Sequence, residues 1–552
     1  MDRMLAAVFV VSCPLLLAGA TFYASPAEGP SSANDCTTRA TAGNIKAAIR
    51  KAVMSRDNSS EVVLLSGVYD CSSYGDSKYG SMTFAPTRST FCFGNNASNG
   101  NLQFAVNIRS ESGNPEDVVI AGGGPGASCS FLHLNVGTVT NTISGVTIRD
   151  FHSSGATVAN ASGGAIYHVN GKLFVSNCWF IANSASMTGG SAPNLGGGAI
   201  YTSAALKCRD CLFMSNRVEN AVNACSGGAV ASYSNQENEL VNCRFVDNSL
   251  SGVAGTSMGG AVWQAYYPSG NPARTGTCTA YGCEFTRNVA KPNGLGGAVY
   301  NVVCCGSSFT NDFSTADGAA GCGERSAFHD CDFYGFTNTC FLVSGASAVE
   351  RCRFAGCRRI GSEGVRFRNC LFDACEIRGT SVGEWTLFWK SELVNCTVVN
   401  TGGWYDRAAV SGGRLMTAVA LDCNVVNCVF AGSSNLVSAS GARGYDVGRS
   451  GPSAVCACTN SFYGTAPVSA SYRPEFAGCS EIADPAALRF AGVGEDPYSV
   501  GRRSPLVGAG LPGAWTSADT DIRGNPRVRD GEVDVGCYQC WSSPPGFGMY
   551  AR

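Results

Sequence analysis

The segment LKCRDCLFMSN, residues 206–216, carries the pattern that decides the fold. Its first half alternates apolar and charged residues, which is the period of two that a β-strand shows. Cys211 and Phe213 continue an alternation of the same period, but its phase slips by one residue at Asp210. One straight strand cannot change phase, whereas two short strands that meet at a sharp corner can. The segment therefore predicts strand, corner and strand, with Asp210 at the corner.

This unit recurs at unequal intervals between about residues 140 and 465. Its first four copies pair a phenylalanine with a following asparagine: Phe180/Asn183, Phe213/Asn216, Phe245/Asn248 and Phe285/Asn288. A second repeat, Gly-Gly-Ala followed by Ile or Val, begins at Gly163, Gly197, Gly227, Gly259 and Gly296. Repeats of this size indicate a solenoid, whose units bury their apolar faces only by stacking on one another.

Eight of the nine predicted corner residues are Asn, Asp or Gly, the types that best tolerate a left-handed backbone. The nine are Asn177, Asp210, Asn242, Gly282, Asp330, Arg351, Asn369, Asn395 and Asn427. Arg351 is the exception, and the sequence offers no reason for it. Strands joined by such corners and stacked in successive turns predict an all-β chain that forms a β-solenoid.

A cysteine follows each corner at an inward position. These nine residues, Cys178, Cys211, Cys243, Cys283, Cys331, Cys352, Cys370, Cys396 and Cys428, should stack as a ladder of buried free thiols in the core. Neighbouring rungs about 4.8 Å apart would allow disulfides by distance, but parallel side chains do not favour them. Cys357 with Cys375, Cys456 with Cys458 and Cys537 with Cys540 are better candidates for bridges.

The chain begins with a targeting segment. Arg3 precedes an apolar run, and Ala18-Gly19-Ala20 suits signal peptidase, so we expect residues 1–20 to be removed after Ala20. An alternative is a lipobox that ends at Cys13. The protein is therefore expected to be secreted or on the cell surface, and no later stretch is long and apolar enough to span a membrane.

Composition limits the possible partners. The chain of 552 residues has 39 Lys+Arg against 41 Asp+Glu, a net charge of −2, so no bulk field attracts nucleic acid or an anionic membrane. Charged residues make up 14% and apolar residues 45%, which excludes intrinsic disorder. We expect a monomer with no nucleic-acid partner.

Two further regions flank the repeats. Residues 21–140 should form an N-terminal cap and the first coils, including a capping helix at Asn44–Val53 whose apolar residues have helical spacing. The repeat region is 141–465, and 466–552 should hold the last coils and a C-terminal region. A cap has a physical purpose, because the open end of a solenoid exposes backbone groups and core.

Resemblances to known families agree with this organisation. VVLLSGVY (residues 62–69) and ISGVTIRDF (residues 143–151) resemble the entry of right-handed β-helix proteins of the pectate-lyase-like class. The paired repeats over 163–312 resemble those of chlamydial polymorphic outer-membrane proteins. Three C-terminal segments are similar to the end of bacterial surface proteins with a choice-of-anchor type Q region: Ser504–Gly510, Asp521–Arg527 and Val533–Tyr538. These resemblances imply that the all-β chain is a right-handed parallel β-helix and a surface protein.

An aromatic row is the first candidate binding site. Tyr167, Tyr201, Trp263 and Tyr300 each follow a Gly-Gly-Ala-Ile/Val repeat, and an exposed row of rings would be a platform for stacking sugars. The alternative is a row packed beneath loops or inside the core.

An arginine-rich segment is the second candidate. Seven arginines lie between Arg351 and Arg378, and Arg366 and Arg368 flank the inward Phe367. Arginine binds carboxylates through two parallel hydrogen bonds, so this pair could bind an acidic polysaccharide. The alternative is a solvated face paired with neighbouring acids.

No catalytic constellation is recognisable in the sequence. His168 and His329 each stand alone, and we expect both to be structural; no metal or cofactor motif is present. The leading hypothesis is an exported β-helix scaffold that binds carbohydrate or another surface. The alternative is a polysaccharide lyase or glycoside hydrolase, which a cluster of acids and a basic residue on adjacent outward positions would favour.

Overall fold

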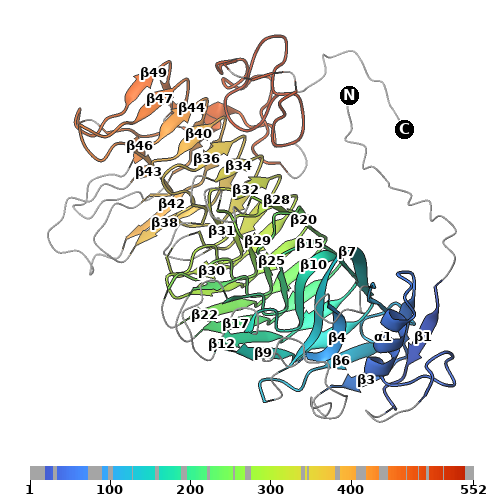
Figure 1. Cartoon of the computed structure of the whole chain (residues 1–552). Helices are drawn as coiled ribbons and strands as arrows, with labels where there is room; N and C mark the ends of the chain where they lie inside the picture. The colour runs from blue at the N-terminus through green and yellow to red at the C-terminus, as the bar shows by residue number, and fades with distance from the viewer. Residues whose placement is uncertain are drawn as a thin grey trace, which may run out of the picture.

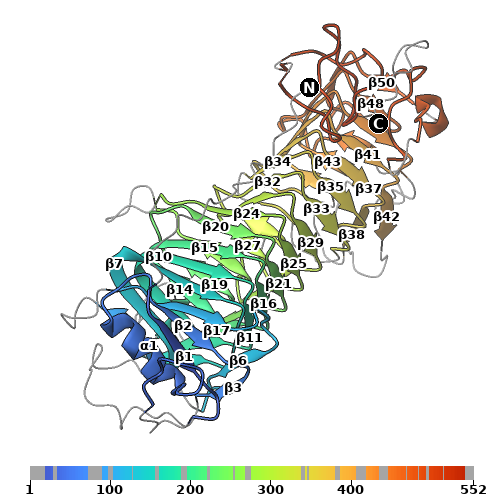
Figure 2. The same cartoon turned by 90° about the vertical axis from the view of Figure 1, so that its right-hand side faces the viewer.

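A computed structural model of the chain describes residues 19–540, except for 29–33, 72–89, 97–103, 127–128, 156–160, 188–194, 221–223, 253–254, 268–274, 317, 337–341, 345–346, 380–385, 406–417, 434–444, 468, 483, 493–495, 514 and 517. Residues 1–18 of the predicted signal segment lie outside the described residues. All pairings between the described strands are parallel along an elongated coil (Figures 1 and 2). The chain is a right-handed parallel β-helix, as the sequence predicts.

Sheet A contains 22 of the described strands. They are β1 (Thr21–Ala24), β2 (Glu61–Leu64), β4 (Thr90–Asn96), β5 (Asn107–Ser110), β7 (Ser130–Ser144), β10 (Ile166–Ser176), β14 (Ile200–Thr202), β15 (Ala205–Arg209), β19 (Val230–Ser232), β20 (Asn238–Val241), β23 (Val262–Gln264), β24 (Cys278–Tyr281), β27 (Val299–Tyr300), β28 (Val303–Cys305), β31 (Gly321–Cys322), β32 (Ala327–His329), β34 (Ala348–Glu350), β36 (Arg366–Arg368), β40 (Glu392–Val394), β44 (Asn424–Val426), β47 (Ala457–Thr459) and β49 (Glu475–Ala477).

Sheets B and C form the other main faces. Sheet B follows chain order through β3 (Gly67–Asp70), β6 (Val118–Ala121), β8 (Thr147–Arg149), β11 (Trp179–Ile181), β16 (Leu212–Met214), β21 (Arg244–Val246), β25 (Glu284–Thr286), β29 (Ser308–Thr310), β33 (Asp332–Tyr334), β35 (Arg353–Ala355), β37 (Leu371–Asp373), β41 (Thr397–Val399), β45 (Val429–Ala431), β48 (Phe462–Tyr463) and β50 (Ser480–Glu481). Sheet C comprises β9 (His152–Gly155), β12 (Ser184–Met187), β17 (Arg217–Asn220), β22 (Ser249–Gly252), β26 (Val289–Lys291) and β30 (Phe313–Ser314).

Three smaller groups of strands complete the coil. The pairs are β13 (Leu195–Gly196) with β18 (Cys225–Ser226) and β38 (Glu376–Gly379) with β42 (Gly402–Tyr405); the trio is β39 (Phe388–Trp389), β43 (Ala418–Leu421) and β46 (Tyr445–Gly448).

The nine predicted corners join sheet A to sheet B. Asp210, for example, lies between β15 and β16, and all nine corner residues have φ between 47° and 59°. The left-handed conformation explains the Asn, Asp and Gly preference.

Arg351 occupies its corner, with φ of 53°, because its side chain has a partner one turn below. Its Nε and Nη2 atoms donate to the two carboxylate oxygens of Asp330 at 2.7 and 2.9 Å. Asp330 is the preceding corner residue, so a charge-assisted pair between stacked corners accounts for the residue that the sequence pattern left unexplained.

Three stacked columns of side chains run through the interior. The nine ladder cysteines are 0–2% exposed, as predicted. Consecutive rings of Phe180, Phe213, Phe245, Phe285, Phe309, Phe333, Phe354 and Phe372 have centroids 4.4–5.0 Å apart. The third column is an asparagine ladder, Asn183, Asn216, Asn248 and Asn288, in which each backbone N and Nδ2 donates to Oδ1 of the next member.

Every cysteine with a described side chain is unbridged. The three pairs considered as bridges therefore carry free thiols in this structure. Cys357, for example, donates to Phe333 O at 3.4 Å, and Cys375 donates to Phe354 O at 3.7 Å. Ladder thiols make the same contact with the preceding rung: Cys178 donates to Ile143 O at 3.6 Å. Burial raises the pKa of the Cys178 thiol to about 12, so this sulfur behaves as a small apolar group with a weak donor.

Each end of the coil is covered. Helix α1 (Ile45–Met54) lies against β1 and β2 at the N-terminal end, with Asn44 Oδ1 accepting from Ala47 N at 2.8 Å as its N-cap (Figure 1). Past β50, the segment 484–540 contributes Leu506, Val535 and other apolar residues to a second core. That core packs on Leu371 and Val399, which point outward from sheet B.

The C-terminal segment is held together by a network of buried hydrogen bonds. Arg527 is completely buried, and its Nη2 donates to Asp534 O at 2.6 Å and to Gly536 O. The buried Asp521 carboxylate accepts from the backbone of Arg523 and of Asn525. Gly508 N donates to Asp534 Oδ1 at 2.8 Å, so the three C-terminal sequence motifs meet in one structural network.

Candidate binding face

The outward positions of sheet A in the C-terminal half of the coil form the candidate site. In β36, Phe367 is fully buried in the core, so Arg366 and Arg368 on either side point outward. Strand pairing places Arg368 beside Glu350 of β34 and places Glu350 beside His329 of β32. The sequence brings these three groups together because each lies two residues before a ladder cysteine.

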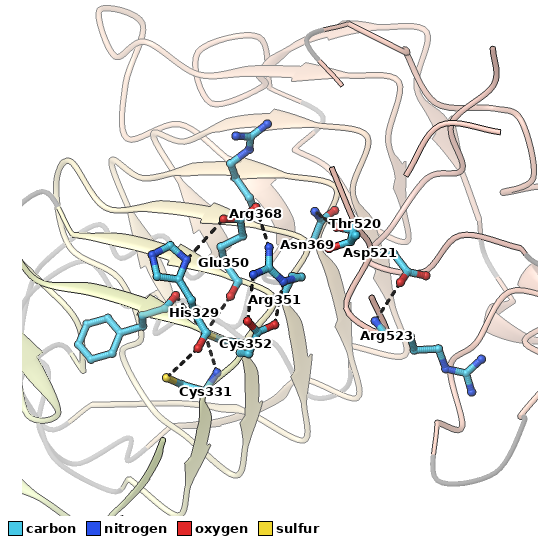
Figure 3. Close-up of polar contacts among 12 residues, drawn as sticks. His329, Cys331, Glu350, Arg351, Cys352, Arg368, Asn369, Thr520, Asp521 and Arg523 are labelled. Carbon is cyan, nitrogen blue, oxygen red and sulfur yellow. Dashed lines mark hydrogen bonds and ion pairs between the residues drawn. The ribbon is translucent and has the colours of Figure 1, made fainter. Parts of the chain in front are cut away.

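His329, Glu350 and Arg351 form a linked polar cluster on this face (Figure 3). His329 Nδ1 lies 3.5 Å from Glu350 Oε2, and Glu350 Oε1 lies 3.2 Å from Arg351 Nη1. The hydrogen bond from His329, followed by the charges of Arg351, His329 and Arg368, lowers the pKa of Glu350. Glu350 is therefore a carboxylate at neutral pH, and the cluster holds an imidazole, a carboxylate and guanidinium groups on consecutive rungs.

The C-terminal segment borders this cluster on one side (Figure 3). Asn369 Nδ2 donates to Thr520 O at 2.9 Å, which joins a corner of the coil to the segment. The Arg368 guanidinium lies 4.3 Å from the centre of the Trp515 ring, a cation–π contact. Trp515 Nε1 in turn donates to Asn395 Oδ1 at 3.0 Å. Arg368 is thus held in a defined orientation.

An open groove of about 810 Å³ lies beside Arg366 on the same face. Its lining comes from four neighbouring coils: Gly364, Val365, Arg366, Lys390, Ser391, Glu392, Asp422, Asn424, Ser450, Ser453, Ala454 and Val455. Cations, carboxylates, hydroxyls and an amide therefore line one depression.

The two cationic side chains that line the groove, Arg366 and Lys390, form only weak ion pairs. The Arg366 side chain is 72% exposed, and its Nε lies 3.7 Å from Glu392. Lys390 Nζ lies 3.5 Å from Glu363. Exposed ion pairs of this kind contribute roughly 0–1 kcal/mol, so a ligand carboxylate can displace them. Asp422, by contrast, already accepts from Ser450 N at 2.8 Å and Ser450 Oγ at 2.7 Å.

The four aromatic residues of the row lie in register on neighbouring strands, but they do not form an open platform. Tyr167, Tyr201, Trp263 and Tyr300 occupy matching positions of β10, β14, β23 and β27, with Ala231 of β19 between them. Tyr167 and Tyr201 stack with centroids 5.2 Å apart.

Burial distinguishes the members of that row. Trp263 is 1% and Tyr201 is 7% exposed, and Tyr233 stacks on Trp263 at 6.1 Å. Burial raises the pKa of Tyr300 to about 12. Tyr201 and Trp263 are therefore packed in the interior, which agrees with the alternative of a packed row. Of the four rings, only those of Tyr167 and Tyr300 are partly exposed.

The two histidines considered structural differ. His168 is fully buried, with Nδ1 2.9 Å from Thr202 Oγ1, and burial lowers its pKa to about 4. His329 instead lies on the outer face beside Glu350. Sequence reasoning missed its link to Glu350, and it also missed Lys390 and Trp515.

In the described part of the chain, no group of three or more His, Cys, Asp or Glu side chains is arranged to hold a metal ion. Among those same residues, no helix is both long and apolar enough to cross a bilayer.

Fold and site together define this chain as a parallel β-helix protein with a polar, mixed-charge groove on one outer face. No family model and no curated protein matches its sequence.

Three solved structures show distant similarity. A rhamnogalacturonan lyase aligns with a TM-score of 0.31 and 10% identity, over 73% of this chain and 87% of that one. Pectate lyase Pel9A aligns with a TM-score of 0.24 and 11% identity, over 94% and 96%. The catalytic domain of a GH87 α-1,3-glucanase, in complex with tetrasaccharides, aligns with a TM-score of 0.27 and 9% identity, over 79% and 69%.

Proposed function

We propose that this protein is an exported β-helix scaffold that binds an acidic polysaccharide in the groove beside Arg366. The observation that carries the proposal is the exposure of Arg366, 72%, next to a groove lined by hydroxyl and amide groups. A sugar acid offers a carboxylate for bidentate pairing with arginine and hydroxyls for Ser450 and Asn424.

The shape of the groove supports a polymeric ligand. Its lining residues come from successive coils, so a chain of sugars can run along the axis and contact Arg366 and Lys390 together. Each contact is weak by itself, and repetition along the polymer raises the total affinity. The partly exposed rings of Tyr167 and Tyr300 offer a further, separate place for a sugar.

Polysaccharide cleavage is the second candidate function, and the cluster on consecutive rungs favours it. A lyase or hydrolase needs a proton acceptor and a cation near the reacting sugar. His329 and Arg368 are candidates for these two roles, with Glu350 orienting the imidazole. Cleavage creates new chain ends, whereas a scaffold retains the polymer unchanged.

We propose in addition that the protein is exported from the cytoplasm. Cleavage after Ala20 places the mature protein outside the cytoplasm, on the surface or in the medium, where acidic polysaccharides are accessible. The C-terminal resemblance to choice-of-anchor type Q regions supports surface association. Determining the N-terminus of the mature protein separates signal-peptide cleavage at Ala20 from lipidation at Cys13.

Binding to purified polysaccharides tests the proposal. Titration calorimetry with polygalacturonate, alginate and dextran should show binding to an acidic polymer and none to neutral dextran. Arg366→Ala should weaken binding about tenfold or more, since a hydrogen bond to a charged group makes a net contribution of roughly 1.5–3 kcal/mol. Arg209→Ala is the matched control, because Arg209 is an exposed arginine on the same face of sheet A.

Equal binding of dextran, or equal weakening by the two substitutions, would contradict the proposal. Release of new reducing or unsaturated ends that His329→Ala abolishes would favour cleavage instead.

A further inference from the structure

We propose that Cys458 and Cys479 are an oxidisable pair that forms a disulfide at the C-terminal end of the coil. Cys458 lies in β47, whose neighbour is β49, and Cys479 lies in the turn between β49 and β50. The disulfide would join the last two coils, ahead of the segment that covers sheet B. This inference is independent of the proposed function.

The two sulfurs are already in contact. Cys479 Sγ lies 3.7 Å from Cys458 Sγ and 3.1 Å from Cys458 O. A disulfide requires about 2.05 Å between sulfurs, so the two atoms must approach by about 1.7 Å. Rotation of the Cys479 side chain serves this, because the residue lies in the turn just before the final strand of the coil.

Access separates this pair from the thiol ladder. Cys479 is partly exposed, whereas Cys458 is fully buried beneath it. Hydrogen bonding from the Cys458 thiol is the main reason that the pKa of Cys479 falls to about 7. Burial instead raises the pKa of the half-buried Cys305 to about 11, so that partly exposed thiol is a weaker acid than Cys479. Cys479 is thus the reactive thiolate of the pair, because a thiolate is the nucleophile in disulfide exchange.

The oxidant is a small-molecule disulfide such as glutathione disulfide. The Cys479 thiolate attacks one of its sulfurs, forms a mixed disulfide and releases one glutathione thiolate. Cys458 then gives its proton to solvent and attacks the Cys479 sulfur, which releases the second glutathione. Two protein thiols lose two electrons and two protons in total, and the oxidant becomes two glutathione thiols.

The experiment uses the full-length folded protein in glutathione redox buffers. Peptide mapping by mass spectrometry without reduction should find Cys458 linked to Cys479, with the ladder cysteines still free. Hydrogen exchange of β49 and β50 should slow roughly tenfold on oxidation and recover on reduction, because the link closes a short loop.

Variants make the outcome decisive. Cys479→Ser should abolish both the link and the slower exchange, whereas Cys305→Ser, at another partly exposed cysteine, should leave both unchanged. Cys458→Ser should leave Cys479 as a stable glutathione adduct. A lasting adduct on Cys479 in the unsubstituted protein, or links scattered among ladder cysteines, would overturn the proposal.

Discussion

At the residue scale, the asparagine ladder ends at an acid. Asp312 follows Asn288 in the column and is fully buried, and its Oδ1 accepts from Asn288 N at 2.8 Å and Asn288 Nδ2 at 2.9 Å. Burial raises the pKa of Asp312 to about 8, although hydrogen bonds from Asn288 and the charge of Arg287 oppose the increase. A deprotonated carboxylate is therefore unfavourable at this position.

We expect Asp312 to make the protein less stable as pH rises. The pKa of Asp312 is about 8 in the folded state against 3.8 for an ordinary aspartate. Between pH 3.8 and pH 8 the folded state therefore keeps a proton on Asp312 that the unfolded state has lost. Its contribution to the free energy of unfolding is complete below about pH 4 and decreases by about 1.4 kcal/mol per pH unit until about pH 8.

Asp312→Asn should remove this dependence and raise stability at pH 8, because an amide there can donate to Phe285 O as Asn288 donates to Phe245 O. Urea unfolding at pH 5 and pH 8 measures the change, with the exposed Asp530→Asn as control. The prediction is wrong if the difference in free energy of unfolding between Asp312→Asn and the unsubstituted protein is the same at pH 5 and pH 8.

At the element scale, packing between rungs holds the strands together. Most strands of sheet B have three residues, too few for independent stability, and each presents one ring or aliphatic chain to the core. Phe285 stacks between Phe245 and Phe309 at 5.0 and 4.9 Å. Such ring pairs add about 0.5–1.5 kcal/mol beyond the area that they bury.

Phe285→Ala should therefore lower the free energy of unfolding by about 3–5 kcal/mol, because the cavity is closed above and below by neighbouring rungs. Phe174→Ala is the matched control: Phe174 is 44% exposed on the outer face of sheet A and should cost less than about 1 kcal/mol. Urea denaturation followed by tryptophan fluorescence measures both. Similar losses in the two variants would show that ring stacking in the core is not what stabilises the coil.

At the scale of the whole molecule, the C-terminal segment folds back onto sheet B and borders the candidate site. Leu506 is completely buried against this surface, while Leu511 in the same segment is 42% exposed. Arg353 of β35 also pairs with Asp496 at 3.0 Å. The segment is thus attached by an apolar core and by ionic contacts.

Leu506→Asp should release the segment, because it places an unpaired charge in the apolar contact with sheet B. Limited proteolysis should then cut within residues 484–540 much faster and leave the coil intact. Leu511→Asp should behave like the unsubstituted protein. If Leu506→Asp is no more sensitive than Leu511→Asp, the segment is held mainly by its polar contacts.

Part of the candidate site could be predicted from sequence and part could not. Arg366 and Arg368 were identified because they flank the inward Phe367, an argument from strand parity alone. The link between His329 and Glu350 was missed although both precede ladder cysteines by two residues. Trp515 could not be assigned to the site, since it lies 147 positions after its partner Arg368 in the sequence.

The sequence by itself determined the coil, its corners and its inward columns. Those features depend on local alternation and on which residues tolerate a left-handed backbone, and both are properties of short segments. Only the tertiary structure decided which outward groups meet, which rings are covered, and which thiols touch. These depend on loop lengths and on the return of the C-terminal segment, which set contacts between residues far apart in the chain, and no local pattern encodes such contacts.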